Sequence, residues 1–367
     1  MDSRGLLLNV LNIEVSLAIR ECQPVDPELV PWFASLPYSM PLNPAIKLSC
    51  IGISVANIQY RFELILKEHL NCPIGECSHS ADIAQLYKEI IEFEIASSEW
   101  AQSIPKYWKP HIWEPKAKYS GAPIPMYQET CEIYPSVQIA SVSNTWRGYQ
   151  LIICKILAIM HTHAWVEPHT SAQIRFSPEK VIQSLVDSMC YSIPFYLGNR
   201  QGIHYISDLT NPKPHHFYPA YHNMRDPPIA KEHILHEDVH MKHVVAYGAW
   251  HSMYPLTMLV TIFTNHSGDC DCIARIPRPG QVAWIGSQLL RTMKLFGLDR
   301  NLGGASAGDP EEYARSVRRA LRFVYKECIS QLLGFPDDGA SFVIPIVDPV
   351  KYQDRFPDFD YKPGSRR

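Results

Sequence analysis

The sequence lacks an excess of charge of one sign. Its 34 lysine and arginine residues are opposed by 37 aspartate and glutamate residues, which leaves a formal net charge of −3 at pH 7. Proteins that bind nucleic acid usually carry a basic surface that attracts the phosphates. The balance therefore gives no electrostatic basis for DNA or RNA as a direct partner.

Long apolar runs are missing as well. No uncharged apolar stretch of 18 residues occurs, and the apolar segment at residues 5–12 is too short for the core of a signal peptide. We therefore expect no membrane partner and a cytoplasmic location.

The motifs of several common chemistries are also missing. There is no G-x-S-x-G elbow, no G-x-G-x-x-G fingerprint and no P-loop. The ten cysteines are scattered, and Cys154 and Cys190 fall inside apolar runs, as expected of small buried hydrophobic side chains. We expect neither a metal nor a cofactor.

One short segment does match a metal motif. His236-Glu237-Asp238-Val239-His240 fits H-E-x-x-H, which can hold zinc on one face of a helix. Asp238, however, puts a charge where such a helix is normally buried, and residue 246, where a third histidine would stand, is Ala246. A solvated, histidine-rich helix is the interpretation we favour.

What the sequence does contain is helical periodicity, which predicts an all-α fold. Between Leu151 and Met160 only Lys155 is charged, so a helix there must be buried on nearly every face. Ser177 and Pro178 have the pattern of a helix start, and Pro194 is expected to end that helix.

Taken in order, the pattern predicts a single helical domain over residues 1–336 and a polar tail over 337–367. The central buried helices are expected at about 144–193 and 244–297. The stretch 104–134 is rich in Pro, Trp and Tyr, which indicates an ordered irregular excursion. Further helices are predicted at 6–20, 46–69, 80–102 and 309–333.

Several spaced motifs recur in a fixed order along roughly residues 8–300. They are ECQPVDPELVPW near Pro24, EWAQSIPKYW ending at Trp108, Tyr134-Pro135, Asn144-Thr-Trp-Arg147, SIPFYLG ending at Gly198, AWHSMYPL, and the Trp284–Gly297 segment. Together they resemble the C-terminal half of the helical regulatory domain of fungal Zn2Cys6 transcription factors. The resemblance implies a multi-helix array with irregular Pro- and Trp-rich loops.

The sequence also departs from that family. The family carries an N-terminal module in which six cysteines hold two zinc ions, and no such module is present from Met1 onward. The first part of the regulatory domain is missing too. We therefore expect a trimmed scaffold that does not read DNA, with a second copy of the chain as a candidate partner that covers the missing packing surface in a homodimer.

A candidate site lies in the predicted helix of residues 244–264. Pro255 cannot donate to the carbonyl of His251 and so leaves that acceptor open. An aromatic helix face beside an open carbonyl favours a pocket wall for a small apolar natural product, with His251 and Tyr254 as catalytic donors. Ordinary aromatic core with a satisfied histidine is the alternative. The residues that share this face are Tyr247, Trp250, His251, Tyr254 and Met258.

A second candidate is Arg147, which lies between aromatic residues at the start of the central helix. With Trp146 it could bind the substrate by clamping a carboxylate or carbonyl. Alternatively, it could bond an acidic neighbour in the core, such as Asp187.

Three functions are consistent with these features. One is a transcription regulator that acts through protein contacts, and it would place the protein in the nucleus. Another is a small-molecule receptor. We favour the third, a cofactor-independent cyclase or isomerase, because helices, caps and apolar faces that agree with one another indicate a fold kept for some purpose other than reading DNA.

The charge balance gives a first testable prediction. Duplex DNA should bind no more tightly than about 10⁻⁴ M at physiological salt, the weak end of non-specific binding. Fluorescence anisotropy with labelled duplexes, run beside a basic DNA-binding domain as a positive control, measures this. Sub-micromolar binding would contradict the prediction and favour the regulator.

Overall fold

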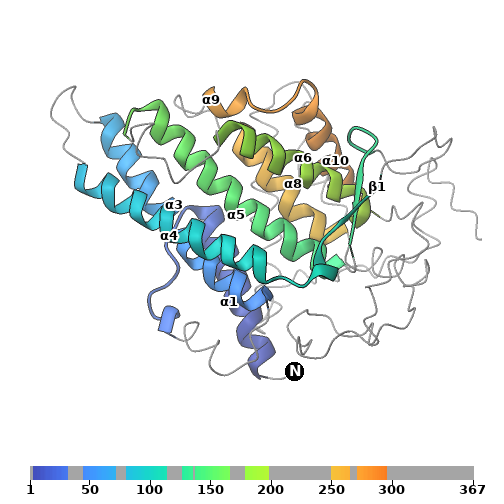
Figure 1. Ribbon diagram of the computed structural model, residues 1–367, viewed down its shortest axis with the longest axis horizontal. Coiled ribbons are helices and arrows are strands. Elements are labelled where there is room, and N and C mark those ends of the chain that lie inside the picture. The colour runs from blue at the N-terminus through green and yellow to red at the C-terminus, as the bar shows by residue number, and fades with distance from the viewer. Residues whose placement is uncertain are drawn as a thin grey trace, which may run out of the picture. The chain divides into compact units, whose positions relative to one another are not determined.

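The computed structural model describes residues 3–31, 44–71, 80–113, 126–134, 137–165, 178–197, 249–264 and 271–295. Helices make up most of these residues (Figure 1), which confirms the predicted mostly helical character. No helix in these ranges has both the length and the apolar character needed to cross a membrane.

The described chain divides into two compact units, and the chain crosses between them after Pro110, after Ile133 and after Leu185, the last of these inside a helix. The first unit contains α1 (Ser3–Glu21), α3 (Pro44–Asn71), α4 (Ser80–Ser103), the short helix η1 (Lys106–Trp108), α5 (Val137–Thr162) and the start of α6 (Pro178–Tyr196). The second contains β1 (His111–Trp113), β2 (Cys131–Ile133), the rest of α6, α8 (Ala249–Thr264), α9 (Asp271–Ala274) and α10 (Gln281–Leu295).

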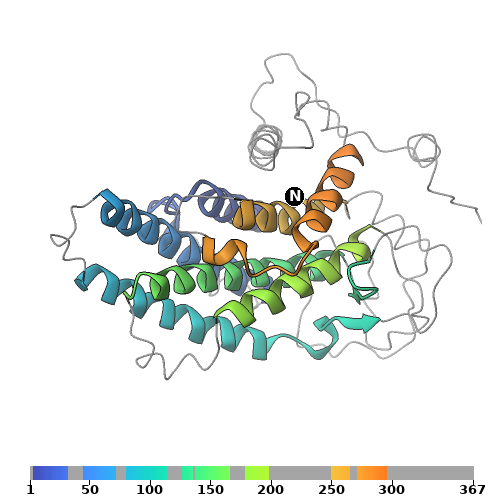
Figure 2. The same cartoon turned by 90° about the horizontal axis from the view of Figure 1, so that it is seen from above.

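The first unit is built around α3, which packs against α1, α4 and α5. Both views show α3 beside α4 (Figures 1 and 2). Arg61 of α3 pairs with Glu89 of α4, and near the other end of the pair the Trp100 indole donates to the Pro44 carbonyl. These contacts make α3 and α4 an antiparallel pair.

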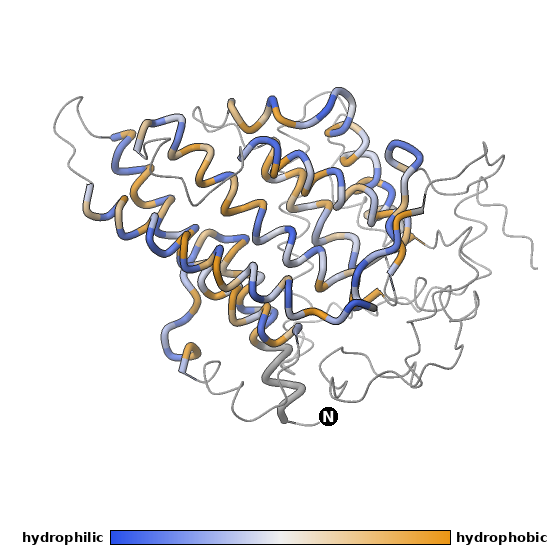
Figure 3. Tube along the Cα trace, in the orientation of Figure 1, coloured by the Kyte–Doolittle hydropathy of each residue, from blue (hydrophilic) through white to orange (hydrophobic). Residues whose placement is uncertain are grey.

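The periodicity of α3 and α4 explains this packing. Hydrophobic residues recur every third or fourth position on both helices, so hydrophobic and hydrophilic residues alternate along them (Figure 3). The apolar stripes are buried, as Ile58 and Phe62 on α3 and Ile90 and Phe93 on α4 show. Their burial supplies most of the driving force that holds the pair together.

Helix α5 approaches α3 at a single glycine. The Tyr149 side chain of α5 lies against Gly52 of α3, so closely that a Cβ atom at Gly52 would overlap its hydroxyl oxygen and lie 2.6 Å from Val15 Cγ1. Tyr149 is itself buried. Gly52 is therefore required by the space between helices rather than by its backbone conformation.

In the second unit, α8 packs against α10 and α9. Strands β1 and β2 pair antiparallel, with His111 opposite Ile133 and Trp113 opposite Cys131. Both strands lie at the ends of the stretch predicted to be an irregular excursion, so the sequence missed this ribbon. Three-residue strands are too short for the period-two pattern to be recognised.

The predicted end of α6 is wrong. Pro194 lies inside the helix, which continues to Tyr196, and the Leu197 N–H still bonds the carbonyls of Ile193 and Pro194. So close to the C-terminal end, proline removes only the hydrogen bond to the carbonyl of Cys190 and does not prevent the last turn from closing.

Several predictions lie outside the described residues. These are the Ser177 cap, the segment His236–His240, Tyr247, the Gly297 stop, the helix at 309–333 and the tail 337–367.

Gly52 gives a matched stability test. Gly52→Ala should lower the free energy of unfolding by about 1–3 kcal/mol, because the added methyl overpacks the contact with Tyr149. The control is Gly286→Ala in α10, where a Cβ meets nothing within 4 Å. That change should be neutral or stabilise by up to about 1 kcal/mol through helix propensity.

Urea titrations followed by circular dichroism measure both variants. Equal midpoints for Gly52→Ala and the wild type would contradict the prediction and show that the Tyr149 side chain moves aside at no cost in stability.

Candidate functional site

Helix α8 carries the residues predicted to be catalytic. The helix contains no Asp, Glu, Lys or Arg, and most of its described side chains are buried. Four that recur at three- and four-residue spacing keep part of their surface exposed, and we call them the α8 stripe: His251, Tyr254, Met258 and Thr261. The face predicted from the sequence is therefore the one face of the described helix that is not sealed in core.

His251 is a neutral imidazole in this stripe. Burial lowers its pKa from an ordinary 6.5 to about 4, because a charged ring would lose its hydration. No hydrogen bond joins its ring to the described part of the chain. A neutral imidazole offers one N–H donor and one acceptor nitrogen, so His251 can serve a ligand in either way.

Pro255 lies one turn after His251, and α8 continues through it to Thr264. Because proline has no N–H, the helix leaves the His251 carbonyl without its usual donor. Next to the proline, the Thr257 hydroxyl lies 2.7 Å from the Met253 carbonyl and 3.0 Å from the Tyr254 carbonyl. The hydroxyl thus reinforces the helix at this point.

Two further predicted residues on this face are incompletely described. Trp250 belongs to α8 by its backbone, but its side chain is not among those described, and Tyr247 precedes the described part of the helix.

Arg147 and Trp146 belong to the other unit and make contacts there. The Arg147 guanidinium is 7% exposed and donates to the Tyr134 hydroxyl (2.7 Å) and to Asn144 Oδ1 (3.1 Å). The Trp146 indole donates to Ser97 Oγ (2.8 Å) and stacks on Trp100. Both side chains therefore join α5 to neighbouring segments of its own unit.

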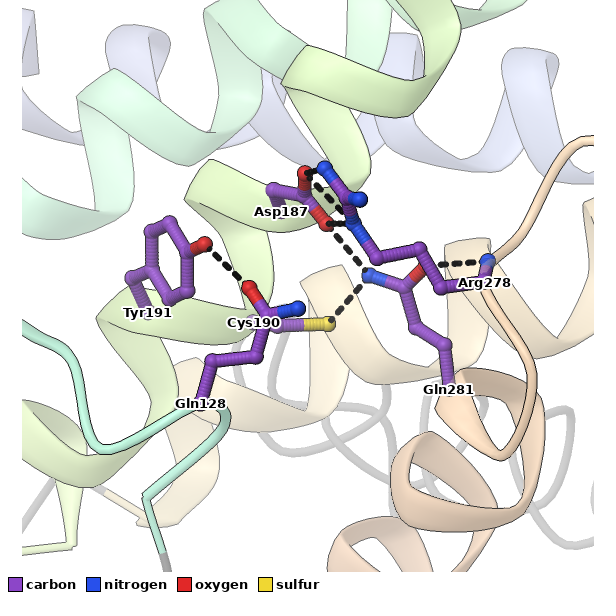
Figure 4. A network of polar contacts seen from close by, with 6 residues as sticks. All are labelled: Gln128, Asp187, Cys190, Tyr191, Arg278 and Gln281. Atoms are coloured by element: carbon purple, nitrogen blue, oxygen red, sulfur yellow. Dashed lines mark hydrogen bonds and ion pairs between the residues drawn. The ribbon is translucent and has the colours of Figure 1, made fainter.

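Asp187, which the sequence offered as a partner for Arg147, is paired in the second unit. Its carboxylate accepts hydrogen bonds from two nitrogens of Arg278, the closest at 2.8 Å. It also accepts one from the side-chain amide of Gln281 at 2.9 Å (Figure 4). Gln281 also donates to Cys190 Sγ and accepts from the backbone N–H of Arg278. One buried amide thus joins α6 to the turn before α10.

Sequence reasoning missed an aromatic group next to this network. The Tyr127 ring lies 5.3 Å from that of Trp284 and 6.1 Å from that of Tyr191, measured between ring centroids. The Tyr191 hydroxyl donates to Gln128 Oε1 at 2.7 Å (Figure 4). We call these three rings the Tyr127 cluster. The one available signal was the spacing of Asp187, Cys190 and Tyr191, which puts them on one side of α6.

Several buried polar atoms lack a hydrogen-bond partner in the described part of the chain. In the second unit they include Trp284 Nε1 and Gln288 Oε1. Leaving such an atom unpaired costs about 1–3 kcal/mol, so it marks a place where a ligand with the complementary group would gain affinity.

Three of the described free cysteines, Cys131, Cys154 and Cys190, are buried thiols held in the protonated form. Burial raises the pKa of Cys154 to about 12 and also raises those of Cys131 and Cys190. Within the described ranges no three His, Cys, Asp or Glu side chains gather as metal ligands.

Comparisons with protein-family models, with curated proteins and with solved structures each give no match.

The buried histidine gives a pH prediction. Because His251 binds a proton less tightly in the folded state, the free energy of unfolding should fall as pH drops from about 6.5 to about 4 and should not depend on His251 above that window. The full difference is about 3 kcal/mol. His251→Asn should remove this part of the pH dependence, which urea titrations at several pH values measure.

The control is His111→Asn, a change at an exposed position of β1. It should keep the wild-type slope. If His251→Asn keeps that slope as well, the imidazole is not desolvated in the folded protein.

Proposed function

We propose that this chain is a cofactor-independent cyclase or isomerase, of the pericyclase (Diels–Alder) type, that acts on a small apolar natural product in fungal biosynthesis. The observation that carries the proposal is the α8 stripe. It combines a neutral imidazole, a phenol, a thioether and a hydroxyl on the partly exposed face of a helix without charged residues.

A unimolecular cyclisation suits such a site. The protein must hold the reactive conformer and stabilise an oxygen that gains charge in the transition state, and both tasks require only shape and hydrogen-bond donors. His251 stays neutral at physiological pH, so one ring nitrogen carries an N–H that can donate and the other can accept. Tyr254, one turn further along, carries a second donor, and Met258 adds apolar surface.

The remaining predicted residues have supporting roles in this proposal. By sequence spacing, Tyr247 and Trp250 extend the aromatic face. Arg147 and Trp146 are secondary substrate contacts, since their described donors already serve Tyr134, Asn144 and Ser97.

The motif resemblance supplies the scaffold and the fungal source in this proposal. In this proposal the regulatory-domain array offers a place for a small molecule. If that ligand site serves catalysis, a helical chain can be an enzyme without any of the common catalytic motifs. A cytoplasmic location follows from the same proposal.

The test uses extracts of a producing strain from which this chain has been deleted. Purified protein without added cofactor should convert an accumulated precursor into an isomer of equal mass, identified by mass spectrometry and NMR. His251→Phe and Tyr254→Phe should each lower turnover, by about 10²-fold if that residue donates to the developing oxyanion.

Tyr87→Phe in α4 is the matched control, because it also removes one phenolic oxygen but belongs to the other unit. Its turnover should equal that of the wild type. Binding of the precursor without conversion would identify a receptor, and conversion undiminished in both α8 variants would exclude the α8 stripe as the site.

A further inference from the structure

The Tyr127 cluster brings together three segments that are far apart in the sequence. Tyr127 precedes β2, Tyr191 lies near the end of α6, and Trp284 is in the first turn of α10. All three belong to the second unit. Tilted rings at centroid distances of 5.3 and 6.1 Å form an apolar surface that a flat molecule can stack against.

Two hydrogen-bond donors of this cluster are not used by the described chain. Trp284 Nε1 has no exposed surface and no partner there. The Tyr127 side chain is 8% exposed, and no hydrogen bond of its hydroxyl reaches the described residues either. Most buried indole N–H and phenol groups do find an acceptor, so an acceptor brought by a ligand would fill this gap.

The charges around the cluster indicate which acceptor fits. Arg278 acts electrostatically on Tyr127, but its guanidinium is already paired with Asp187, so the two leave no net charge. Burial, reinforced by the Asp187 carboxylate, raises the pKa of Tyr127 to about 12, which keeps its hydroxyl a donor. An anionic ligand would find no unpaired cation at the described residues of the cluster, whereas an uncharged carbonyl oxygen requires none.

The turn that carries Tyr127 explains how a ligand could enter. Gln128 and Glu129 have left-handed backbone conformations, with φ of 49° and 56°, which residues with a Cβ rarely adopt. The turn is held by the bond from Tyr191 to Gln128 and by the Thr130 N–H to the Tyr127 carbonyl. No described hydrogen bond fixes the Tyr127 hydroxyl, so its ring can turn away from Trp284 without breaking one.

We propose that the Tyr127 cluster is a binding site for a flat, conjugated molecule that carries an uncharged carbonyl oxygen. The molecule stacks against the aromatic rings, and its oxygen accepts from Trp284 Nε1 and from the Tyr127 hydroxyl. The site is separate from the α8 stripe and requires no catalysis, so it stands independently of the proposed function.

The probe is coumarin, a planar lactone, compared with naphthalene, which has no acceptor, and with coumarin-3-carboxylate, which is an anion. Ligand-observed NMR should show that coumarin binds more tightly than either analogue. Trp284→Phe and Tyr127→Phe should each weaken coumarin binding by about 5- to 10-fold, the effect of losing one neutral hydrogen bond. Tyr87→Phe, which removes a phenolic oxygen in the other unit, should leave the affinity unchanged.

A second readout follows the wild-type protein and needs a variant only to assign one signal. In protein labelled with ¹⁵N-tryptophan, the indole N–H signal that is missing from Trp284→Phe belongs to Trp284. Its proton should shift downfield as coumarin saturates, because a hydrogen bond forms where none existed.

Four results would each overturn the site: no coumarin binding at millimolar concentration, equal binding of naphthalene, wild-type affinity in both folded variants, or an unmoved Trp284 signal at saturation. None of them bears on turnover in extracts. A failed extract assay, conversely, leaves coumarin binding untouched.

Discussion

Burying α5 on almost every face imposes one condition on the first unit: each polar group that the helix carries inward must find its partner inside. Asn144 and Arg147 meet this condition together, since one nitrogen of the guanidinium donates both to Asn144 and to the Tyr134 hydroxyl. Tyr149, which is buried too, fits only because α3 has a glycine at the contact. The polar and steric demands of one helix thus select residues on its neighbours.

In the second unit, buried polar groups find their partner in one side-chain amide, that of Gln281. Asp187 and Cys190 point from α6 toward Gln281, whose donor serves both of them while its oxygen accepts the Arg278 N–H. The Pro-Gly turn before α10 is thereby attached to α6 by the side chain that begins α10. Such a fully satisfied network fixes geometry more sharply than apolar contacts alone, because any shift breaks several hydrogen bonds together. It therefore sets the distance between Tyr191 and Trp284, which follow one turn later on the two helices.

The helices could be predicted from the sequence wherever an apolar stripe and an end signal agree. The bounds of α3 and α4 fall within two residues of prediction for this reason. Pro194 misled the prediction, since proline near a C-terminal end removes one hydrogen bond without stopping the last turn. The strands were missed because their pairing is decided between residues on either side of a long excursion, which local periodicity does not record.

The residues of the candidate sites were likewise predicted where helical spacing decides their position and missed where packing decides it. Spacing alone placed His251, Tyr254 and Met258 on one face of α8, because residues three and four apart on a helix must share a face. Spacing could not show which face of an apolar helix would keep exposed surface. Nor could it show that Tyr127 and Trp284 lie together, because that contact depends on how β2, α6 and α10 pack.

The polar groups of the second unit that lack a described hydrogen-bond partner limit the kinds of ligand chemistry that this unit can support. The buried carboxylate of Asp187 is paired, and burial keeps the thiols of Cys131 and Cys190 protonated. The groups without a described partner include the imidazole of His251, the hydroxyl of Tyr127, and the Trp284 N–H and Gln288 carbonyl oxygen. All four are uncharged, and burial lowers the pKa of the imidazole, which keeps it so. Uncharged donors and acceptors in apolar surroundings act on a carbonyl by hydrogen bonding rather than by full proton transfer, so the interior of this unit favours polarising an uncharged ligand over ionising one.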